Sequence, residues 1–320
     1  MTPLVSLGAD PEFVVVGPDG PEPAHRWYPH KHSALQFAGG SVYRDGYAVE
    51  LNFAAPTPDP AVLMHWMASL FASAEAQLPV THHLEARPSW FTQPADFEAA
   101  PPDVLEFGCE PTLNAYTGKT LRPPAEAART YLRSGGGHGH FGVVGLMPEG
   151  GGEPVWNVGP WFASAESRFL WVRLMDYYAG VPLGVLLNTP LETARRRLYG
   201  RAGELRLQHY GSYFEGTDRY VMAGLEYRVM SNRVYSNEAL GTLFLRIGQH
   251  LMANFETYAA SWHPELEVEV CSALNTGRGY MQLLLGHPGL EGIYSPGNIL
   301  EWYEQRFLFT AFTLPYTGGN

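Results

Sequence analysis

Apolar and polar residues alternate with a period of two in several short segments of this chain. From residue 47 to residue 53, Glu50 and Asn52 fall on the side opposite the apolar residues Val49 and Leu51. Alternation of this kind is typical of a β-strand with one buried face. The segment therefore predicts a strand that presents a carboxylate and an amide opposite the core.

Two later segments repeat the alternation with other side chains. His138 and His140 share one face of a predicted strand, and Glu226 and Arg228 share one face of another. Charged and imidazole groups thus recur on the polar faces of strands that are far apart in sequence. These two strands are predicted at residues 138–145 and 225–230, and further strands at residues 11–17, 81–87 and 103–108.

Four segments show helical patterns, and three of them begin at a residue suited to cap a helix. Asp59 is suited to the N-cap position, and Pro60 fits the first turn that follows it. Ser164 and Ser236 are predicted to cap two further helices, and Gly180 is predicted to end the helix that Ser164 begins. The helices are predicted at residues 59–77, 164–179, 236–258 and 298–312, with loops at residues 88–102 and 147–154.

Strands and helices follow one another without the regular strand–helix–strand rhythm of a parallel sheet. This order favours an α+β fold in which an antiparallel sheet carries helices on one face. No segment has the composition of a linker, so residues 1–320 are expected to form a single domain. A chain of this length has ample material for one large core.

The composition is that of a globular protein and narrows the range of partners. Hydrophobic residues make up 45% of the chain, charged residues make up 17%, and the formal net charge is −11. An acidic protein is disfavoured as a general nucleic-acid binder. No apolar run approaches the roughly 20 residues of a membrane helix, and the first residues do not resemble a signal peptide. We therefore expect a cytoplasmic protein without a membrane or nucleic-acid partner, although a local basic cluster exists at Arg195, Arg196, Arg197, Arg201 and Arg206.

The cysteine content excludes one class of metal site. The chain has two cysteines, Cys109 and Cys271, and no CxxC pair. A zinc site built from cysteines is therefore ruled out. Free thiols in a reducing compartment are expected rather than a single disulfide.

The polar faces of the predicted strands together offer ligands for a divalent cation. Glu12, Glu50 and Glu226 supply hard carboxylate oxygens, which suit Mg²⁺ or Mn²⁺. His138 and His140 add imidazole nitrogens that can bind a metal or donate a hydrogen bond to a phosphate. The sequence therefore predicts a site for a metal–nucleotide complex on one face of the sheet.

Two arginines complete this predicted site. Arg228 and Arg206 can neutralise the charge of a phosphoryl group during its transfer. Each motif alone also has an ordinary explanation, because a segment such as residues 135–142, rich in glycine and histidine, is usually a turn. A strand with one glutamate is most often half-solvated. The functional interpretation depends on the co-occurrence of the motifs.

Five short motifs, taken in order, resemble those of a known family. They are GADPEF (8–13), DGYAVELN (45–52), GGGHGHFG (135–142), RRRLYGRAGELR (195–206) and LEYRVMSN (225–232). In this order they resemble the amidoligases of the glutamine synthetase and glutamate–cysteine ligase superfamily. The likeness is greatest to the carboxylate–amine ligase-like proteins often encoded by phages. Two further segments, at residues 107–116 and 174–187, also resemble that group.

The resemblance implies a fold and a reaction. The fold would be glutamine synthetase-like, an antiparallel sheet curved into an open half-barrel with helices on its convex face and the active site on its concave face. The reaction would be the ATP-dependent joining of a carboxylate to an amine. ATP would phosphorylate the carboxylate, and the amine would then displace phosphate to leave an amide. A carboxylate, an amine, ATP and Mg²⁺ or Mn²⁺ are therefore the implied substrates and cofactors.

The resemblance also assigns roles to individual residues. It implies that Arg228 and His140 act on the phosphoryl group or the carboxylate substrate. The residues matched to contacts with ATP are Arg206, His140 and, by a weaker likeness, Lys31. The residues matched to metal ligands are Glu12, Glu50, His138 and Glu226.

The sequence departs from the family at two places. Residues 207–224 separate Arg206 from the LEYR motif, whereas the family runs almost directly from one to the other. This departure leaves open whether Arg206 reaches a phosphate. Asn188 stands where an acidic residue is expected.

Two other functions remain open at this point. The same carboxylates would serve a metal-dependent hydrolase or phosphotransferase. The chain could also be a non-catalytic phage or host-interaction protein built on a decayed ligase scaffold. The intact set of candidate ligands favours the ligase, because a binding surface has no need of that set.

Overall fold

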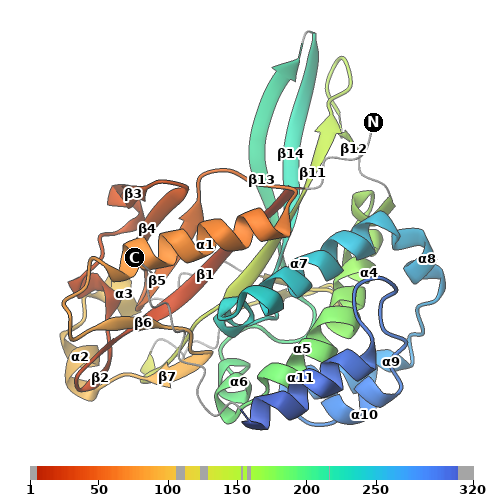
Figure 1. The fold of residues 1–320 in the computed structure, drawn as a ribbon. Helices are drawn as coiled ribbons and strands as arrows, with labels where there is room; N and C mark the ends of the chain where they lie inside the picture. Colours follow the sequence, from red (N-terminus) through yellow and green to blue (C-terminus); the bar gives the residue numbers. More distant parts are fainter. Residues whose placement is uncertain are drawn as a thin grey trace.

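The computed structural model describes residues 6–105, 112–122, 129–152, 154–156, 160–215 and 217–308. Within these residues the fold is α+β, with one large open antiparallel sheet and helices packed against it (Figure 1). The predicted fold class is confirmed at this level. No helix of the described residues is long and apolar enough to cross a membrane.

The main sheet has twelve strands, and its principal path runs in the order β3-β4-β5-β1-β11-β14-β13-β8-β9. Strands β2 and β6 pair with the far end of β1, and β12 pairs with β11. A second sheet contains only β7 (Ser89–Phe91) and β10 (Leu132–Ser134). The strands of the main sheet are β1 (Ser6–Gly17), β2 (Gly20–Glu22), β3 (Leu35–Phe37), β4 (Gly40–Asp45), β5 (Ala48–Phe53), β6 (His83–Glu85), β8 (Thr112–Asn114), β9 (Thr120–Leu121), β11 (Gly137–Leu146), β12 (Val155–Trp156), β13 (Glu204–Glu215) and β14 (Asp218–Tyr227).

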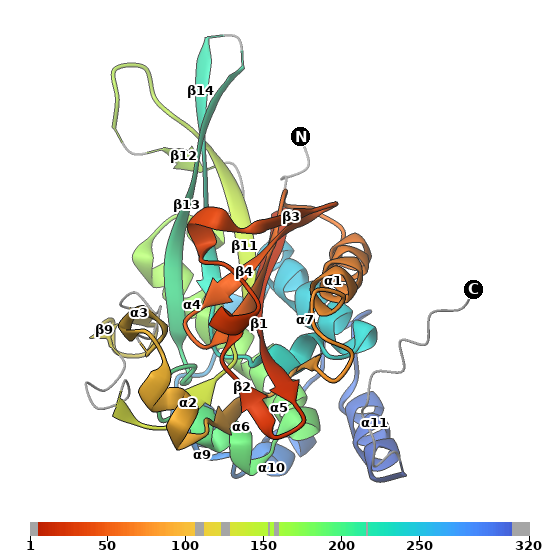
Figure 2. The same cartoon turned by 90° about the vertical axis from the view of Figure 1, so that its left-hand side faces the viewer.

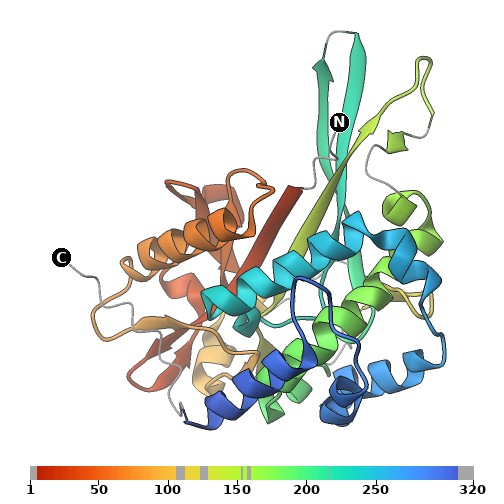
Figure 3. The same cartoon turned by 45° about the vertical axis from the view of Figure 1, so that its right-hand side comes forward.

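Helices α1 and α7 lie on the same side of strand β1 (Figure 2), and the helices after residue 160 stack beside the sheet (Figure 3). Short 3-10 turns occur at Ala24–Arg26, Lys31–Ser33, Pro160–Phe162 and Asn232–Tyr235. The α-helices are α1 (Pro60–Glu75), α2 (Pro94–Ala99), α3 (Pro102–Leu105), α4 (Ala165–Met175), α5 (Val181–Leu187), α6 (Pro190–Arg195), α7 (Glu238–Ala253), α8 (Phe255–Ala260), α9 (Leu266–Thr276), α10 (Tyr280–Leu285) and α11 (Pro296–Leu308).

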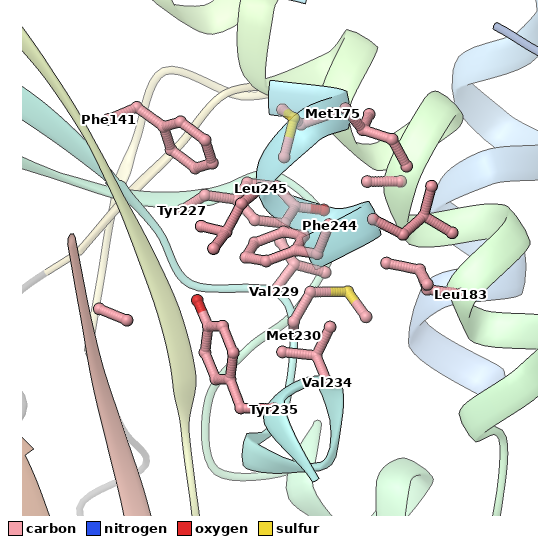
Figure 4. Packing of buried hydrophobic residues seen from close by; sticks show 14 of the residues in the cluster. Phe141, Met175, Leu183, Tyr227, Val229, Met230, Val234, Tyr235, Phe244 and Leu245 are labelled. Atoms are coloured by element: carbon pink, nitrogen blue, oxygen red, sulfur yellow. The ribbon is translucent and has the colours of Figure 1, made fainter. Parts of the chain in front are cut away.

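The alternation along each central strand divides the sheet into an apolar face and a polar face. In β1, Leu7 and Phe13 are buried in the main core, whereas Asp10 and Glu12 project from the other face. Figure 4 shows the apolar side, where Phe141 of β11 and Tyr227 of β14 pack near Phe244 of α7. The core therefore holds the strands from one side and leaves their polar side chains together on the other.

The predictions for residues 81–108 were partly wrong. The strand predicted at residues 81–87 is only the short β6. The predicted loop at residues 88–102 contains strand β7 and helix α2. Where a strand was expected at residues 103–108, the chain forms helix α3 up to Leu105, and the rest lies outside the described residues. In both helices a proline occupies the first turn, where it needs no hydrogen-bond partner for its nitrogen.

Gly180 does not end the helix that Ser164 begins. Ser164 caps α4 as predicted, but the chain continues through a π-helical turn at Asp176–Gly180 into α5. Gly180 has ordinary helical angles, with φ −60° and ψ −44°. A Cβ atom there would lie 2.9 Å from a methyl group of Leu274. The glycine therefore permits close packing against α9 rather than termination.

The helix predicted at residues 236–258 is two helices. Asn237, not Ser236, caps α7, because its side-chain oxygen accepts a hydrogen bond from the nitrogen of Ala239 at 2.8 Å. The helix ends at Ala253, and α8 follows. The cap predicted at Asp59 is confirmed, with its carboxylate 2.8 Å from the nitrogen of Ala61.

Residues 207–224, which depart from the family pattern, form most of a long hairpin of β13 and β14. Figure 1 shows this hairpin extending beyond the layer of helices. Its register shifts between His209 and Gly211. Leu207, in this hairpin, is 45% exposed.

Candidate metal and phosphate site

Antiparallel pairing places the predicted site residues directly beside one another. Residues opposite each other in an antiparallel pair carry their side chains on the same face. Four adjacent strands, β5, β1, β11 and β14, therefore contribute neighbouring polar side chains. The pairs are Glu12 with Glu50, Asp10 with His138, and His140 with Glu226.

A first group consists of the carboxylates of Glu12, Asp45 and Glu50, which we call the acidic triad. One oxygen from each lies within 4.8 Å of the others. Glu50 accepts a short hydrogen bond from the hydroxyl of Tyr43. Glu12 accepts two hydrogen bonds, and its donors are the nitrogen of Gly136 at 2.7 Å and the hydroxyl of Tyr199 at 2.7 Å.

No described residue forms an ion pair with the acidic triad. Asp45 makes no side-chain hydrogen bond or ion pair within this part of the chain, and Lys31 and Arg228 act on it only at longer range. Burial, together with Glu12 and Asp10, raises the pKa of Asp45 to about 6. Burial also raises the pKa of Glu50 well above its usual value, and Asp10 and Asp45 add to the effect. Clustered carboxylates of this kind are stabilised by a divalent cation.

A second group consists of Asp10, His138 and Glu226, whose ligand atoms also lie within 4.8 Å of one another. Nδ1 of His138 lies 3.2 Å from a carboxylate oxygen of Asp10 and 3.0 Å from one of Glu226. The other nitrogen of His138, Nε2, is buried and has no hydrogen-bond partner among the described residues. His140 lies two residues after His138 on β11, and its Nε2 is 3.3 Å from a carboxylate oxygen of Asp10.

Glu226 is fully buried and lies at the centre of a cationic network. Arg206 contacts one of its oxygens through Nε at 2.6 Å, and Gln208 donates to the same oxygen at 2.7 Å. Arg228 and His138 contact the other oxygen. Both oxygens of Glu226 are therefore already occupied by donors, whereas those of Asp45 are not.

The charges of this second group stabilise one another. Burial acts to raise the pKa of Glu226, but Arg228 and His138 lower it well below its usual value. Burial also acts to raise the pKa of Asp10, and His140 and His138 lower it in the same way. The pKa of His140 is raised, because Asp10 outweighs the effect of burial. The sheet thus presents two neighbouring groups. In the group of Asp10, His138 and Glu226 the negative charges have cationic partners in contact, whereas those of the acidic triad do not.

The glycines of the GGGHGHFG segment allow this crowding. From Gly137 onward the segment belongs to strand β11 and not to a turn. A Cβ atom at Gly136 would overlap the ring of His138, and one at Gly139 would lie 2.6 Å from Phe244. Glycine lets the histidine on one face and the aromatic core on the other approach the backbone closely.

The structure brings all eight predicted site residues to this region, although two of them lie at its edge. Lys31 is exposed, with its ammonium 5.3 Å from the centre of the Tyr43 ring. Arg206 is partly exposed and contacts Glu226 despite the long hairpin that follows it. The other six are the buried or nearly buried residues Glu12, Glu50, His138, His140, Glu226 and Arg228.

The sequence alone did not identify several members of the site. Asp10 and Asp45 both fall inside motifs that were recognised, and Asp10 is two residues before Glu12 and so shares its face. That spacing was a usable signal. Tyr43 precedes the DGYAVELN motif by two residues, which gave no chemical hint. Tyr199 also falls inside a recognised motif, but its contact with Glu12 depends on tertiary packing. Gln208 is two residues after Arg206 on β13 and so shares its face, a spacing that was overlooked as well.

A buried arginine fixes the chain segment that follows Glu226. Arg195 is fully buried and donates hydrogen bonds to the carbonyl oxygens of Arg228, Val229 and Met230 at 2.8 to 3.0 Å. Tyr199, four residues later, reaches Glu12. The segment from Arg195 to Tyr199 thereby links the residues that follow β14 to β1.

Replacing Arg195 with methionine is expected to destabilise the protein by about 3–5 kcal/mol, because three buried carbonyl groups lose their donor. Urea denaturation of the purified variant measures this loss. The exposed Arg246 of α7, changed to methionine, is the matched control and should stay within about 0.5 kcal/mol of the parent. A loss below 1 kcal/mol for Arg195→Met would contradict the structural role.

A second prediction follows from the raised pKa of Asp45. A folded-state pKa of about 6 exceeds the unfolded value, so protonation favours folding and that contribution is lost as the pH rises through 6. Asp45→Asn should therefore raise the stability of the metal-free protein at pH 7.5, by on the order of 2 kcal/mol. Thermal melts in EDTA at pH 5 and pH 7.5 measure this gain.

The gain should be smaller at pH 5, where Asp45 is already largely protonated. Added Mg²⁺ should raise the melting temperature of the parent but not that of Asp45→Asn. The exposed Asp19, changed to asparagine, provides the control for a simple change of net charge. A lower stability of Asp45→Asn at pH 7.5 would show that the carboxylate is favourably paired.

Comparisons with known proteins do not assign this chain to a family. No family model matches the sequence, and no curated protein matches it. Among solved structures, the chain is similar to a bifunctional glutathione synthetase from Pasteurella multocida, with 13% sequence identity and a TM-score of 0.44. The match covers 95% of this chain and 46% of the other, so the chain spans about half the length of that protein. A likeness at this level establishes neither a shared fold nor a shared activity.

Proposed function

We propose that this protein is an ATP- and Mg²⁺-dependent ligase that joins a carboxylate to an amine, on a glutamine synthetase-like sheet. The observation that carries the proposal is the pairing of two charge groups on one sheet face. The acidic triad offers carboxylate oxygens that form no ion pair with a described residue, and the network around Glu226 offers two arginines. A reaction that brings a triphosphate and a carboxylate together needs both.

The acidic triad fits a magnesium ion. Its ligand atoms are all carboxylate oxygens, which Mg²⁺ prefers, and they approach one another within 4.8 Å. Glu12 and Glu50 would hold the ion, as the family resemblance implies, and Asp45 would join them. A bound Mg²⁺ supplies positive charge that offsets repulsion between phosphate and carboxylate oxygens. His138 and Glu226 would complete the metal-binding region, with Asp10 orienting His138 through Nδ1.

The remaining residues would bind and orient the reacting groups. Arg228, held by Glu226, would stabilise negative charge on the transferred phosphoryl group. Arg206 and Lys31 lie at the more exposed edges, where the triphosphate of ATP would enter. His140, with its raised pKa, would donate a hydrogen bond to a phosphate or to the substrate carboxylate.

The chemistry explains why a phosphoryl donor is needed. An amine cannot expel oxide from a carboxylate, but it can displace phosphate from an acyl phosphate. The transferred phosphoryl group carries away the carboxylate oxygen, and the amine nitrogen forms the new bond. Fixed positive charges beside the transferred group contribute most to such a step.

A screen for ADP release tests this function. The protein, ATP and Mg²⁺ are combined with pairs of carboxylic acids and amines, including peptides, and ADP is measured for each pair. The ligase predicts release that requires both partners and yields one amide for each ADP. Release that needs only a hydroxyl acceptor or water would favour the phosphotransferase or hydrolase. Amide cleavage without ATP would refute the ligase.

A further inference from the structure

A second charged region lies outside the polar face of the sheet. A cleft of about 710 Å³ opens between the segment after α6 and the C-terminal end of α9. This volume is within the range of small-molecule sites. The cleft is lined by Thr193, Arg196, Arg197, Arg201, Ser272, Asn275, Thr276 and Arg278.

The cleft concentrates positive charge in a protein with a formal net charge of −11. Four of its eight lining residues are arginines, and none is acidic. Within the described part of the chain, none of these arginines forms an ion pair with a carboxylate. By contrast, Arg26, Arg44, Arg87, Arg173, Arg206 and Arg228 all do.

Arg196 is a buried and fixed residue at the base of the cleft, unlike a solvated arginine of the surface. Its side chain is only 7% exposed, and one of its terminal nitrogens donates to the carbonyl oxygen of Gly200. Its Nε is buried without a hydrogen-bond partner among the described residues. Arg201 is fixed beside it, with Nε 3.0 Å from the carbonyl oxygen of Arg196. The buried carboxyl of Asp176 acts on Arg196 electrostatically but forms no ion pair with it, so an anion in the cleft would supply the direct partner that this buried guanidinium lacks.

The lining selects the chemistry of that anion. Guanidinium groups bind phosphate oxygens in a bidentate manner, and the remaining lining side chains are hydroxyls and one amide. No aromatic or large aliphatic side chain lines the cleft, so a nucleobase would find no stacking surface. The C-terminal end of α9 carries only about half a negative charge, which four arginines outweigh.

We propose that this cleft is a binding site for a small oligophosphate anion, distinct from the metal site. Arg196 and Arg201 would form its floor, and the exposed Arg197 and Arg278 would close over the ligand from two sides. Such a site binds the free anion through arginines and needs no metal ion. The proposal does not depend on the ligase activity, because it rests on a separate set of residues.

Calorimetric titration with tripolyphosphate, in EDTA and at low ionic strength, tests the proposal. EDTA removes divalent cations, so binding at the acidic triad is suppressed. The double variant Arg197→Ser/Arg278→Ser should weaken tripolyphosphate binding at least tenfold while the melting temperature is unchanged. Both residues are exposed, so the change should not disturb the core.

The control is the double variant Arg219→Ser/Arg246→Ser, which removes the same charge from exposed positions elsewhere. It should bind tripolyphosphate as the parent does. Equal weakening in both double variants would show an effect of overall charge and would overturn the proposal. Absence of binding to the parent would overturn it as well. Tighter binding of a single-stranded oligonucleotide through Arg197 and Arg278 would replace it with a nucleic-acid site.

Discussion

Replacing Glu50 with glutamine is expected to weaken the binding of Mg²⁺–ATP at least ~100-fold while the fold is retained. The amide has nearly the same shape, and its oxygen can still accept the hydrogen bond from Tyr43. The change removes one of the three carboxylates of the acidic triad, and neutral oxygens bind Mg²⁺ far less strongly than carboxylates. Loss of a partner that only orients a metal ligand already costs 10- to 100-fold.

Isothermal titration of Mg²⁺–ATP into the parent and into Glu50→Gln measures this effect. Because the substitution relieves repulsion with Asp45 and Asp10, the metal-free variant should melt at a temperature equal to or above that of the parent. Glu265→Gln, on the exposed surface, is the matched control and should bind as the parent does. Unchanged affinity in Glu50→Gln would exclude Glu50 as a ligand.

Replacing Arg228 with lysine is expected to lower kcat for ADP release by roughly 10²- to 10³-fold, with a much smaller change in KM for ATP. Arg228 is 2% exposed, lies two residues after Glu226 and forms an ion pair with it. A group that stabilises charge only as it develops on the phosphoryl group affects turnover more than ground-state binding. Lysine keeps the positive charge beside Glu226, so the buried carboxylate retains a cation.

Two comparisons make the Arg228 experiment specific. Arg206→Lys should have a weaker effect on kcat and a larger one on KM, because Arg206 is more exposed and lies toward the edge of the site. Circular dichroism and melting temperature report whether Arg228→Lys remains folded. Equal losses in kcat and in affinity for ATP would contradict the proposed role of Arg228.

The alternation of the sequence predicted which side chains share a face, but it did not predict their partners. Glu50 was correctly placed opposite the apolar side of its strand. Its position beside Glu12 depends on the register between β1 and β5, which is set by tertiary packing across 37 intervening residues. Asp45 was missed because it ends β4, where the alternating pattern stops.

The largest errors in the predicted elements arose where packing outweighs local preference. Gly180 is a plain helix terminator by its residue type, yet the core requires a small residue at this crossing with α9. Residues 94–99 and 102–105 are too short to show a helical period, and only their first prolines indicated helix. The four-residue metal site predicted from the motifs appears as two neighbouring groups, because the arginines predicted at the same site, together with Gln208, already bind the oxygens of Glu226.

Titration with Mn²⁺ followed by electron paramagnetic resonance tests the metal site most directly, first without ATP and then with it. The acidic triad predicts protein-bound Mn²⁺ that increases when ATP is added and is lost when Glu12, Asp45 and Glu50 are changed together to their amides. Mn²⁺ that binds only to free ATP and not to the protein, or that binds equally to the triple variant, would contradict a metal–nucleotide site on this face of the sheet.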